Sequence, residues 1–149
     1  MGSRYDGTKT EVRALNAFIA LQRAAESVES ATQAEIVKAD LTQSQFGVLE
    51  VLLHLGPMCA KDLAGKLLRS KGNLTLVVEN LEKRGLIKRT RNDDDQRIQT
   101  VTLTNKGRKL IMAIFPEHVR GITTALAALT ATEQETLRHI CRKLGRAQG

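Results

Sequence analysis

The sequence predicts a mainly α-helical fold with one small β element (α+β), and three observations support this. Apolar residues recur at three- and four-residue steps through most of the chain, which is the spacing of amphipathic helices. That period changes in one stretch, residues 86–103, to two runs rich in β-formers. The breaks between periodic segments are short and carry Gly, Pro, Asn or Asp. A length of 149 residues fits a single domain, residues 1–149.

Long helices are predicted at both ends of the chain. Residues 9–37 form the first, because apolar residues recur at helical spacing and neither Gly nor Pro interrupts them. Residues 105–128 form another, in which Pro116 predicts a kink or a restart, since proline removes one backbone hydrogen bond. The last helix follows a capping box in which Thr130 and Glu133 satisfy each other's backbone N–H groups.

Shorter helices are predicted in the middle of the chain. A capping box, Thr42–Gln45, begins the first of them, and Gly56-Pro57 ends it. A helix over residues 59–68, a turn at 69–73 and a helix that runs to Arg84 follow. Two helices joined by so short a turn are typical of a helix-turn-helix.

Gly85 fits the C-terminal cap of that helix, and a β-hairpin is predicted after it. Residues 86–91 and 98–103 are the two strands, and the acidic segment between them has turn chemistry. A hairpin directly after a helix-turn-helix is the element order of a winged helix. We therefore expect a winged helix over residues 42–104, with Thr104 capping the helix that follows.

The positive charge of the chain is concentrated in one internal third. Residues 61–110 hold 13 Lys and Arg against 6 Asp and Glu, and the remaining residues hold 10 of each, so this segment carries the whole net charge of +7. A basic block inside a folded domain suits a polyanion such as double-stranded DNA. A solvated basic face explains the charge equally well.

Composition argues against membrane and secretory classes. No run of 18 apolar residues occurs, Trp is absent, and the N-terminus lacks the apolar core of a signal peptide. The two cysteines, Cys59 and Cys141, do not make a disulfide scaffold. We therefore expect a cytoplasmic protein that does not bind membranes.

The terminal helices predict assembly. Their apolar stripes are long for a chain of this size, and a small winged helix cannot cover all of them. Packing against a second copy would cover them and would present two winged helices to two DNA half-sites. An intramolecular bundle is the alternative. We expect residues 9–37 and 105–146 to form the dimerisation part of a homodimer.

Three phrases in the chain match a known family. They are Leu81-Glu82-Lys83-Arg84-Gly85-Leu86-Ile87, then Asp95-Gln96-Arg97, and then Leu103-Thr104-Asn105-Lys106-Gly107. In this order and spacing the chain, from about residue 12 to 145, resembles the multiple-antibiotic-resistance regulator (MarR) family of bacterial transcription factors. The resemblance implies an obligate dimer that binds a pseudo-palindromic operator. It also implies that DNA is released when a small ligand binds or a cysteine is oxidised.

Candidate DNA contacts lie around the start of the helix that ends at Arg84. Its core face takes four apolar residues, Leu74, Val77, Val78 and Leu81, which leaves a polar face for the major groove. The candidates for phosphate or base contacts are Ser70, Lys71, Asn73, Thr75 and Leu76. Ser70 fits a helix N-cap equally well, and Gly72 departs from the family, which more often has a polar residue there.

The hairpin, or wing, has a basic stem and an acidic tip. By resemblance, Asp95 orients an arginine, and Arg97 enters the minor groove, where A/T-rich DNA has an enhanced negative potential. Arg89 or Arg91 is the expected ion-pair partner of Asp95. Lys88 and Arg89 are also candidate DNA contacts, and the aspartates before Asp95 are read as a solvated loop tip.

No catalytic constellation is present in the sequence. Nucleotide-binding, zinc-protease and hydrolase motifs are missing, and the three histidines are scattered. We expect no enzymatic activity, no cofactor and no metal site. Cys59 begins the predicted helix 59–68, where a helix N-terminus and nearby Lys61 favour a thiolate, so it is a candidate redox sensor. Filling the core or capping the helix is the alternative role for Cys59.

The sequence therefore predicts a dimeric, sequence-specific DNA-binding repressor that a small molecule or oxidation releases from its operator. An effector would bind between the dimerisation helices and the winged helix, in a pocket lined by Phe18, Gln22, Phe46 and Ile111. The alternative function is a winged-helix protein-interaction module without specific DNA binding.

Overall fold

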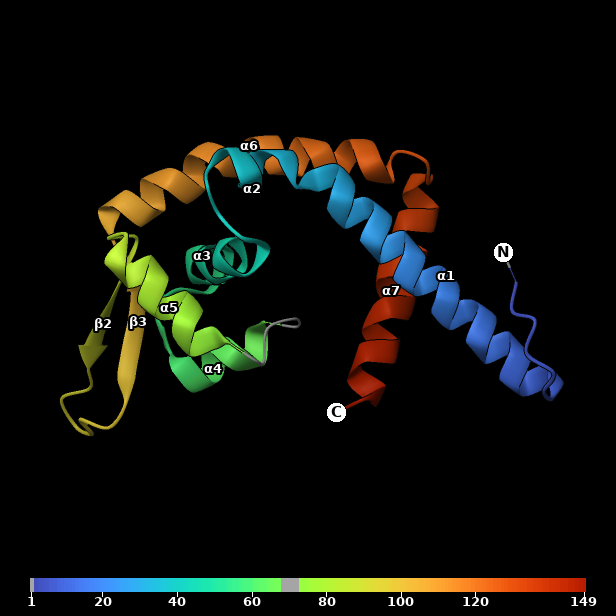
Figure 1. The fold of residues 1–149 in the computed structure, drawn as a ribbon, viewed down its shortest axis with the longest axis horizontal. Coiled ribbons are helices and arrows are strands. Elements are labelled where there is room, and N and C mark those ends of the chain that lie inside the picture. Colours follow the sequence, from blue (N-terminus) through green and yellow to red (C-terminus); the bar gives the residue numbers. More distant parts are fainter. Residues whose placement is uncertain (1, 68–72) are drawn as a thin grey trace. The chain divides into compact units, whose positions relative to one another are not determined.

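The computed structural model describes residues 2–67 and 73–149 of the chain (Figure 1). It is mainly helical and holds a three-stranded antiparallel sheet, which confirms the predicted fold class. The chain divides into two compact units. One is Gln33–His118, called here the winged-helix unit, and the other joins Met1–Thr32 to Val119–Gly149 and is called the helical unit.

Helices and strands of the winged-helix unit enclose one apolar core. The helices are α2 (Ala34–Lys38), α3 (Gln43–Leu55), α4 (Ala60–Lys66), α5 (Leu74–Lys83) and the first part of α6 (Asn105–Leu126). Residues with almost no exposed surface come from all of them or from the sheet, among them Ile36, Phe46, Leu49, Leu63, Leu81, Val101 and Ile111. The core thus fixes α5 against α3 and the sheet.

The predicted capping box at the start of α3 is confirmed. The Gln45 backbone N–H donates to Thr42 Oγ1 at 3.1 Å, and the Thr42 N–H donates to Gln45 Oε1 at 3.0 Å. The helix ends at Leu55 before Gly56, whose φ of +80° is a conformation that other residues rarely adopt.

The sheet has the strand order β1-β3-β2. Strands β2 (Ile87–Arg91) and β3 (Gln99–Leu103) form the predicted hairpin, and Ile87 pairs with Leu103. Strand β1 (Met58–Cys59) was not expected from the sequence. It is only two residues long, too short to show alternation, and becomes a strand because Met58 pairs with Val101 of β3.

The prediction of one helix over residues 9–37 is wrong. Helix α1 (Lys9–Thr32) ends before Gln33, and α2 then begins separately at Ala34. The Thr32 hydroxyl donates to the carbonyl oxygens of Val28 and Glu29, both at 3.0 Å. Such back-bonding bends helices, and the Ser and Thr residues of this stretch are weak helix formers.

Two further boundaries differ from the prediction. Helix α4 covers Ala60–Lys66 rather than 59–68, because Cys59 belongs to β1 and Leu67 is extended, with φ −89° and ψ 105°. Helix α6 continues through Pro116, so of the two predicted outcomes, a kink or a restart, the restart does not occur. A 22-residue helix loses only one hydrogen bond to that proline.

The helical unit consists of α1, the end of α6 and α7 (Ala131–Ala147). Within the described residues, only Thr32 of α1 is buried and no residue of α7 is. Large apolar side chains are exposed along these helices, namely Phe18, Leu21, Val119, Leu137, Ile140 and Leu144. The predicted capping box of Thr130 and Glu133 begins α7. No helix of the described chain has the length and apolar character needed to cross a membrane.

Candidate nucleic-acid interface

Helix α5 is amphipathic in the way that the sequence predicts. Val78 and Leu81 are buried in the core, whereas Asn73, Thr75 and Leu76 are exposed near its N-terminal end. Leu76 keeps 48% of its surface exposed, although it is large and apolar. Asn73 stands at the N-cap position, and its side chain makes no capping hydrogen bond. Ser70, Lys71 and Gly72 lie outside the described residues.

The C-terminal end of α5 is held by the start of α6. Gly85 adopts φ +72°, and Leu86 N–H donates to the Leu81 carbonyl at 3.0 Å, as in a Schellman-type helix end. Thr104 Oγ1 donates to the Gly85 carbonyl at 2.6 Å and accepts the Gly107 N–H at 3.0 Å. The backbone carbonyls of Gly85 and Leu86 therefore bond directly to Thr104, after the wing.

Lys106 and Gly107 complete that junction. Lys106 Nζ donates to the Arg84 carbonyl at 2.9 Å. A Cβ added at Gly107 would overlap the carbonyl group of Leu86, so only glycine allows this approach. The first and third phrases of the sequence resemblance are therefore the two halves of one contact that positions α5.

Arg84 ties α5 to the segment before α3. Its guanidinium donates to the carbonyl oxygen of Asp40 at 2.7 Å and to that of Ala39 at 3.4 Å. Asp40 has φ +55°, a left-handed conformation that asparagine and aspartate tolerate better than most residues. Sequence reasoning missed this role, because nothing in the pattern places Arg84 beside a loop 44 residues away.

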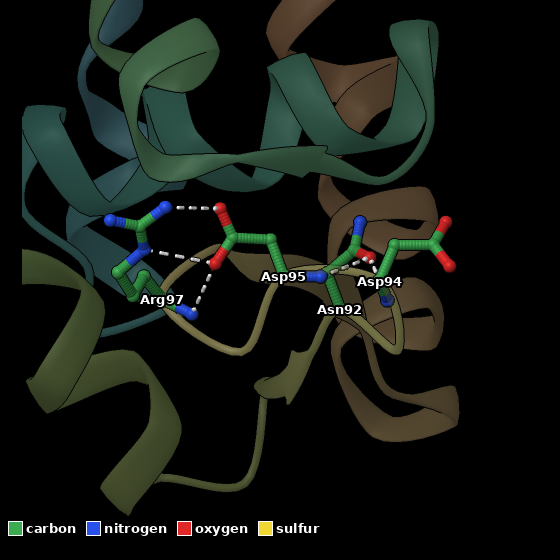
Figure 2. Close-up of polar contacts among 4 residues, drawn as sticks. All are labelled: Asn92, Asp94, Asp95 and Arg97. Atoms are coloured by element: carbon green, nitrogen blue, oxygen red, sulfur yellow. Dashed lines mark hydrogen bonds and ion pairs between the residues drawn. The ribbon is translucent and has the colours of Figure 1, made fainter.

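The wing loop is organised by two side chains (Figure 2). Asn92 Oδ1 accepts the backbone N–H groups of Asp94 at 2.8 Å and Asp95 at 3.3 Å. Asp95 in turn accepts from Arg97, through the backbone N–H at 3.0 Å and through Nε and Nη2 at 3.1 Å each. These hydrogen bonds hold the pKa of the Asp95 carboxyl below its ordinary value. The loop thus presents Arg97 in one orientation.

The prediction that Asp95 pairs with Arg89 or Arg91 is wrong, since its partner is Arg97, two residues away. Arg89 instead donates to Glu82 of α5, from Nε at 3.2 Å and from Nη2 at 2.8 Å. Alternation along β2 explains this, because Arg89 shares a face with buried Ile87, toward α5. That alternation could have revealed the pair from sequence.

The remaining basic candidates of the wing point to solvent. Lys88 lies on the opposite face of β2 from Arg89 and is exposed, as is Arg91. Asp93 and Asp94 are exposed at the tip. Near the N-terminal end of α5 and on the wing, the described structure thus offers Asn73, Thr75, Leu76, Lys88 and Arg97 on accessible surface.

The four residues predicted to line an effector pocket are distributed over both units. Phe46 and Ile111 belong to the buried core of the winged-helix unit, and Phe18 and Gln22 are exposed on α1. Beside Phe46 lies His118, with ring centroids 4.6 Å apart. His118 is 7% exposed, and its Nδ1 has no hydrogen-bond partner among the described residues. A buried nitrogen without a partner is unusual in folded proteins.

Cys59 stands at the N-cap of α4, one residue before the helix begins, and is half-buried. Its side chain makes no capping hydrogen bond. Among residues 2–67 and 73–149, no cluster of three or more His, Cys, Asp or Glu side chains could hold a metal ion.

Known proteins are similar to this chain in sequence and in structure. A sequence model described as the MarR family matches residues 41–99. The HTH-type transcriptional regulator MhqR of Bacillus subtilis is 32% identical over 133 residues, which are 89% of this chain and 92% of that protein. The match therefore extends through both compact units.

Two solved structures show the same fold. Bordetella bronchiseptica BpsR, whose DNA binding is regulated by 6-hydroxynicotinic acid, is 26% identical, with a TM-score of 0.78 over 87% of this chain and 98% of that one. The MarR family regulator Sco3205 of Streptomyces coelicolor, solved in complex with DNA, is 23% identical, with a TM-score of 0.81 over 97% of this chain and 92% of that one. The family model and the identity with MhqR across nearly the whole of both chains establish that this chain belongs to the MarR family and is a DNA-binding transcriptional regulator, not an enzyme.

Proposed function

We propose that the chain acts as a homodimeric repressor that places two copies of α5 and the wing on the half-sites of a pseudo-palindromic operator. The observation that carries the proposal is the accessible polar end of α5 together with an exposed Arg97 held by Asp95. A helix of this kind enters the major groove with its N-terminal residues, and an arginine on a wing suits the minor groove. A protein bound at a promoter excludes the transcription machinery from it, so we propose repression rather than activation. The protein would act in the cytoplasm, where bacterial DNA lies.

The proposed contacts divide into two kinds. Asn73, Thr75 and Leu76 would meet base edges. Ser70 and Lys71, which lie outside the described residues, stay sequence-based candidates for phosphate or base contacts. Lys88 and Arg97 would meet the backbone and the minor groove. Phosphate contacts fix register and base contacts supply specificity, so the two kinds should respond differently to mutation.

Exposed apolar surface supports the homodimer. In a single chain α7 buries none of its described residues, although Leu137, Ile140 and Leu144 lie on one side of it. An exposed apolar stripe of this length marks an interaction surface. A second copy of the chain covers it most simply, because two-fold symmetry also matches a pseudo-palindrome.

Release by a small molecule is supported by the buried nitrogen of His118. A ligand with a hydroxyl or carboxylate group would satisfy Nδ1 beside Phe46, and BpsR responds to a hydroxylated aromatic acid. Ile111 is part of the same core. The lining by Phe18 and Gln22 stays a prediction from the sequence. Oxidation of Cys59 is the other proposed route. Either signal must favour a form of the protein that binds DNA less well, because otherwise it does not change DNA affinity.

The experiment is a binding titration with the DNA upstream of the chain's own coding sequence, against a shuffled duplex of equal length and composition. We expect preference for the upstream DNA and a log–log salt slope of about −5 to −9, as for some 6–10 phosphate contacts. Equal and nearly salt-independent binding to both duplexes would favour a protein-interaction module instead. The exposed Asp93 and Asp94 are the feature that fits this alternative.

A further inference from the structure

We propose that Glu82 and Arg89 are a positioning pair, which fixes the wing relative to α5 and does not itself contact DNA. The inference rests on the proposed function, because it concerns how two DNA-binding elements are held in register. It differs from the direct DNA contact that the sequence suggests for Arg89.

The pair joins two elements that must reach DNA together. Glu82 lies in the last turn of α5, and Arg89 lies in β2, the first strand of the wing. Nε and Nη2 of Arg89 each donate to a different carboxylate oxygen of Glu82, at 3.2 and 2.8 Å. This bidentate geometry fixes orientation as well as distance, which a single contact does not.

The accessibility of Arg89 differs from that of the proposed DNA contacts. Its side chain is 28% exposed, whereas that of Arg97 is 91% exposed. Alternation along β2 aims Arg89 at α5 and aims Lys88 away from it. Reaching a phosphate would therefore require Arg89 to leave both bonds to Glu82.

Without Arg89, the negative charge of Glu82 would be electrostatically unfavourable at this position, which indicates that the pair has a functional role. A carboxylate in the last turn of a helix faces the negative end of the helix dipole. Any acid close to the DNA-binding surface also repels phosphate. Arg89 offsets both effects, and its hydrogen bonds hold the pKa of the Glu82 carboxyl below the ordinary value. A partly exposed pair of this kind adds little to folding stability, so a role in stability alone does not explain it.

Two conservative substitutions distinguish a positioning pair from a direct DNA contact by how they change DNA affinity. Glu82→Gln removes a negative charge near DNA, so electrostatics alone predicts tighter binding to every duplex. Positioning predicts the opposite for the operator, namely weaker binding to the upstream DNA with unchanged or tighter binding to the shuffled duplex. Arg89→Lys keeps the positive charge but cannot donate two parallel hydrogen bonds to one carboxylate. A phosphate contact would therefore survive this substitution, whereas the bidentate pairing with Glu82 would not.

The matched control is Lys88→Gln on the outer face of the same strand. We expect it to weaken binding to both duplexes and to make the salt slope shallower by about one, as for a lost phosphate contact. Each of Glu82→Gln and Arg89→Lys should weaken only operator binding, by about three- to tenfold, without changing the slope. Thermal melting and sedimentation confirm that each variant keeps its fold and assembly.

The result that overturns the inference is tighter binding of Glu82→Gln to both duplexes, with Arg89→Lys indistinguishable from the wild type. Failure of the proposed function gives a different result, because the wild type itself would then show no preference for the upstream DNA. A charge-exchanged double variant, Glu82→Arg with Arg89→Glu, provides a rescue test. Operator binding above that of both single reversals supports the pair, and no recovery contradicts it.

Discussion

Asp95 accepts three hydrogen bonds from Arg97, one from its backbone N–H and two from its guanidinium, all within 3.1 Å. The Arg97 side chain nevertheless remains 91% exposed, against 35% for Asp95. The carboxylate therefore aims the guanidinium without covering it. An arginine held in this way loses little conformational entropy when it enters a groove.

Replacing Arg97 by alanine is expected to weaken operator binding while leaving the fold and the homodimer intact. The side chain is almost fully exposed and bonds to Asp95 of its own loop, so its loss removes no core packing. An arginine in the minor groove is worth about 1–3 kcal/mol of discrimination on the scale of a good base contact. Titration of the upstream DNA, with a melting curve for each variant, measures both effects. Unchanged affinity for the upstream DNA would contradict this role, whatever small loss of stability follows from losing the bonds to Asp95.

The wing pair also predicts how stability depends on pH. The folded-state pKa of Asp95 is depressed, so the pair stabilises the fold above the unfolded-state pKa and is lost as pH falls through the folded one. The wild type should therefore exceed Asp95→Asn in free energy of unfolding near pH 7, and the difference should shrink below about pH 4. Urea unfolding across pH tests this, with Asp93→Asn as the neighbouring control. A pH-independent difference would rule out the carboxylate charge as the cause.

Leu76 is expected to contact a thymine methyl group. It is a large apolar side chain, 48% exposed, next to polar residues on the accessible end of α5. The thymine C5-methyl is the apolar group that the major groove offers. Leu76→Ala should weaken operator binding by about 0.8 kcal/mol for each buried methyl or methylene group.

That contact can be removed from the DNA side as well. Operator in which uracil replaces thymine lacks the methyl groups, so Leu76→Ala should cost much less there. Asn73→Ala is the control, because a polar contact does not depend on the methyl group. An equal loss from Leu76→Ala on both operators would show that Leu76 does not contact thymine.

The contact between α6 and the end of α5 predicts that alanine substitutions at two glycines change the free energy of unfolding differently. A Cβ at Gly107 would overlap the carbonyl group of Leu86, and we expect Gly107→Ala to destabilise the fold by about 1–3 kcal/mol. Among the described residues, Gly65 in α4 has no atom within 4 Å of the corresponding position, apart from its own helix backbone. Gly65→Ala should therefore be neutral or stabilising, by up to about 1 kcal/mol. Denaturant unfolding of both variants compares them directly, and a stable Gly107→Ala would refute the close approach.

Local signals in the sequence predicted most of the fold. Thr42 with Gln45 and Thr130 with Glu133 are complete capping boxes, so those helix starts depend on four adjacent residues and could be read directly. The hairpin was also predictable, because strand propensity and an acidic turn coincide. The break at Gln33 was not, since it depends on back-bonding by Thr32 within an otherwise uninterrupted pattern.

Long-range contacts account for what the sequence did not reveal. Strand β1 exists only through its pairing with β3, in which Met58 pairs with Val101, and no local pattern marks it. Arg84 bonds to the carbonyls of Ala39 and Asp40 for the same kind of reason. The partner of Asp95 was misjudged for the opposite reason. The prediction looked to the neighbouring strand, whereas the partner, Arg97, is only two residues away in the same loop.

The measurement that tests the central claim most directly is the composition of the operator complex by analytical ultracentrifugation. Labelled upstream DNA is sedimented with increasing protein, alongside a duplex that carries only one half-site of the operator. We predict two chains on the full site, the free protein sedimenting as a dimer, and weaker binding to the half-site. In Leu137→Glu and Ile140→Glu variants, whose charges fall on the apolar stripe of α7, both the dimer and tight operator binding should be lost together. A wild-type protein that sediments as one chain and binds the full and half sites equally would contradict the account.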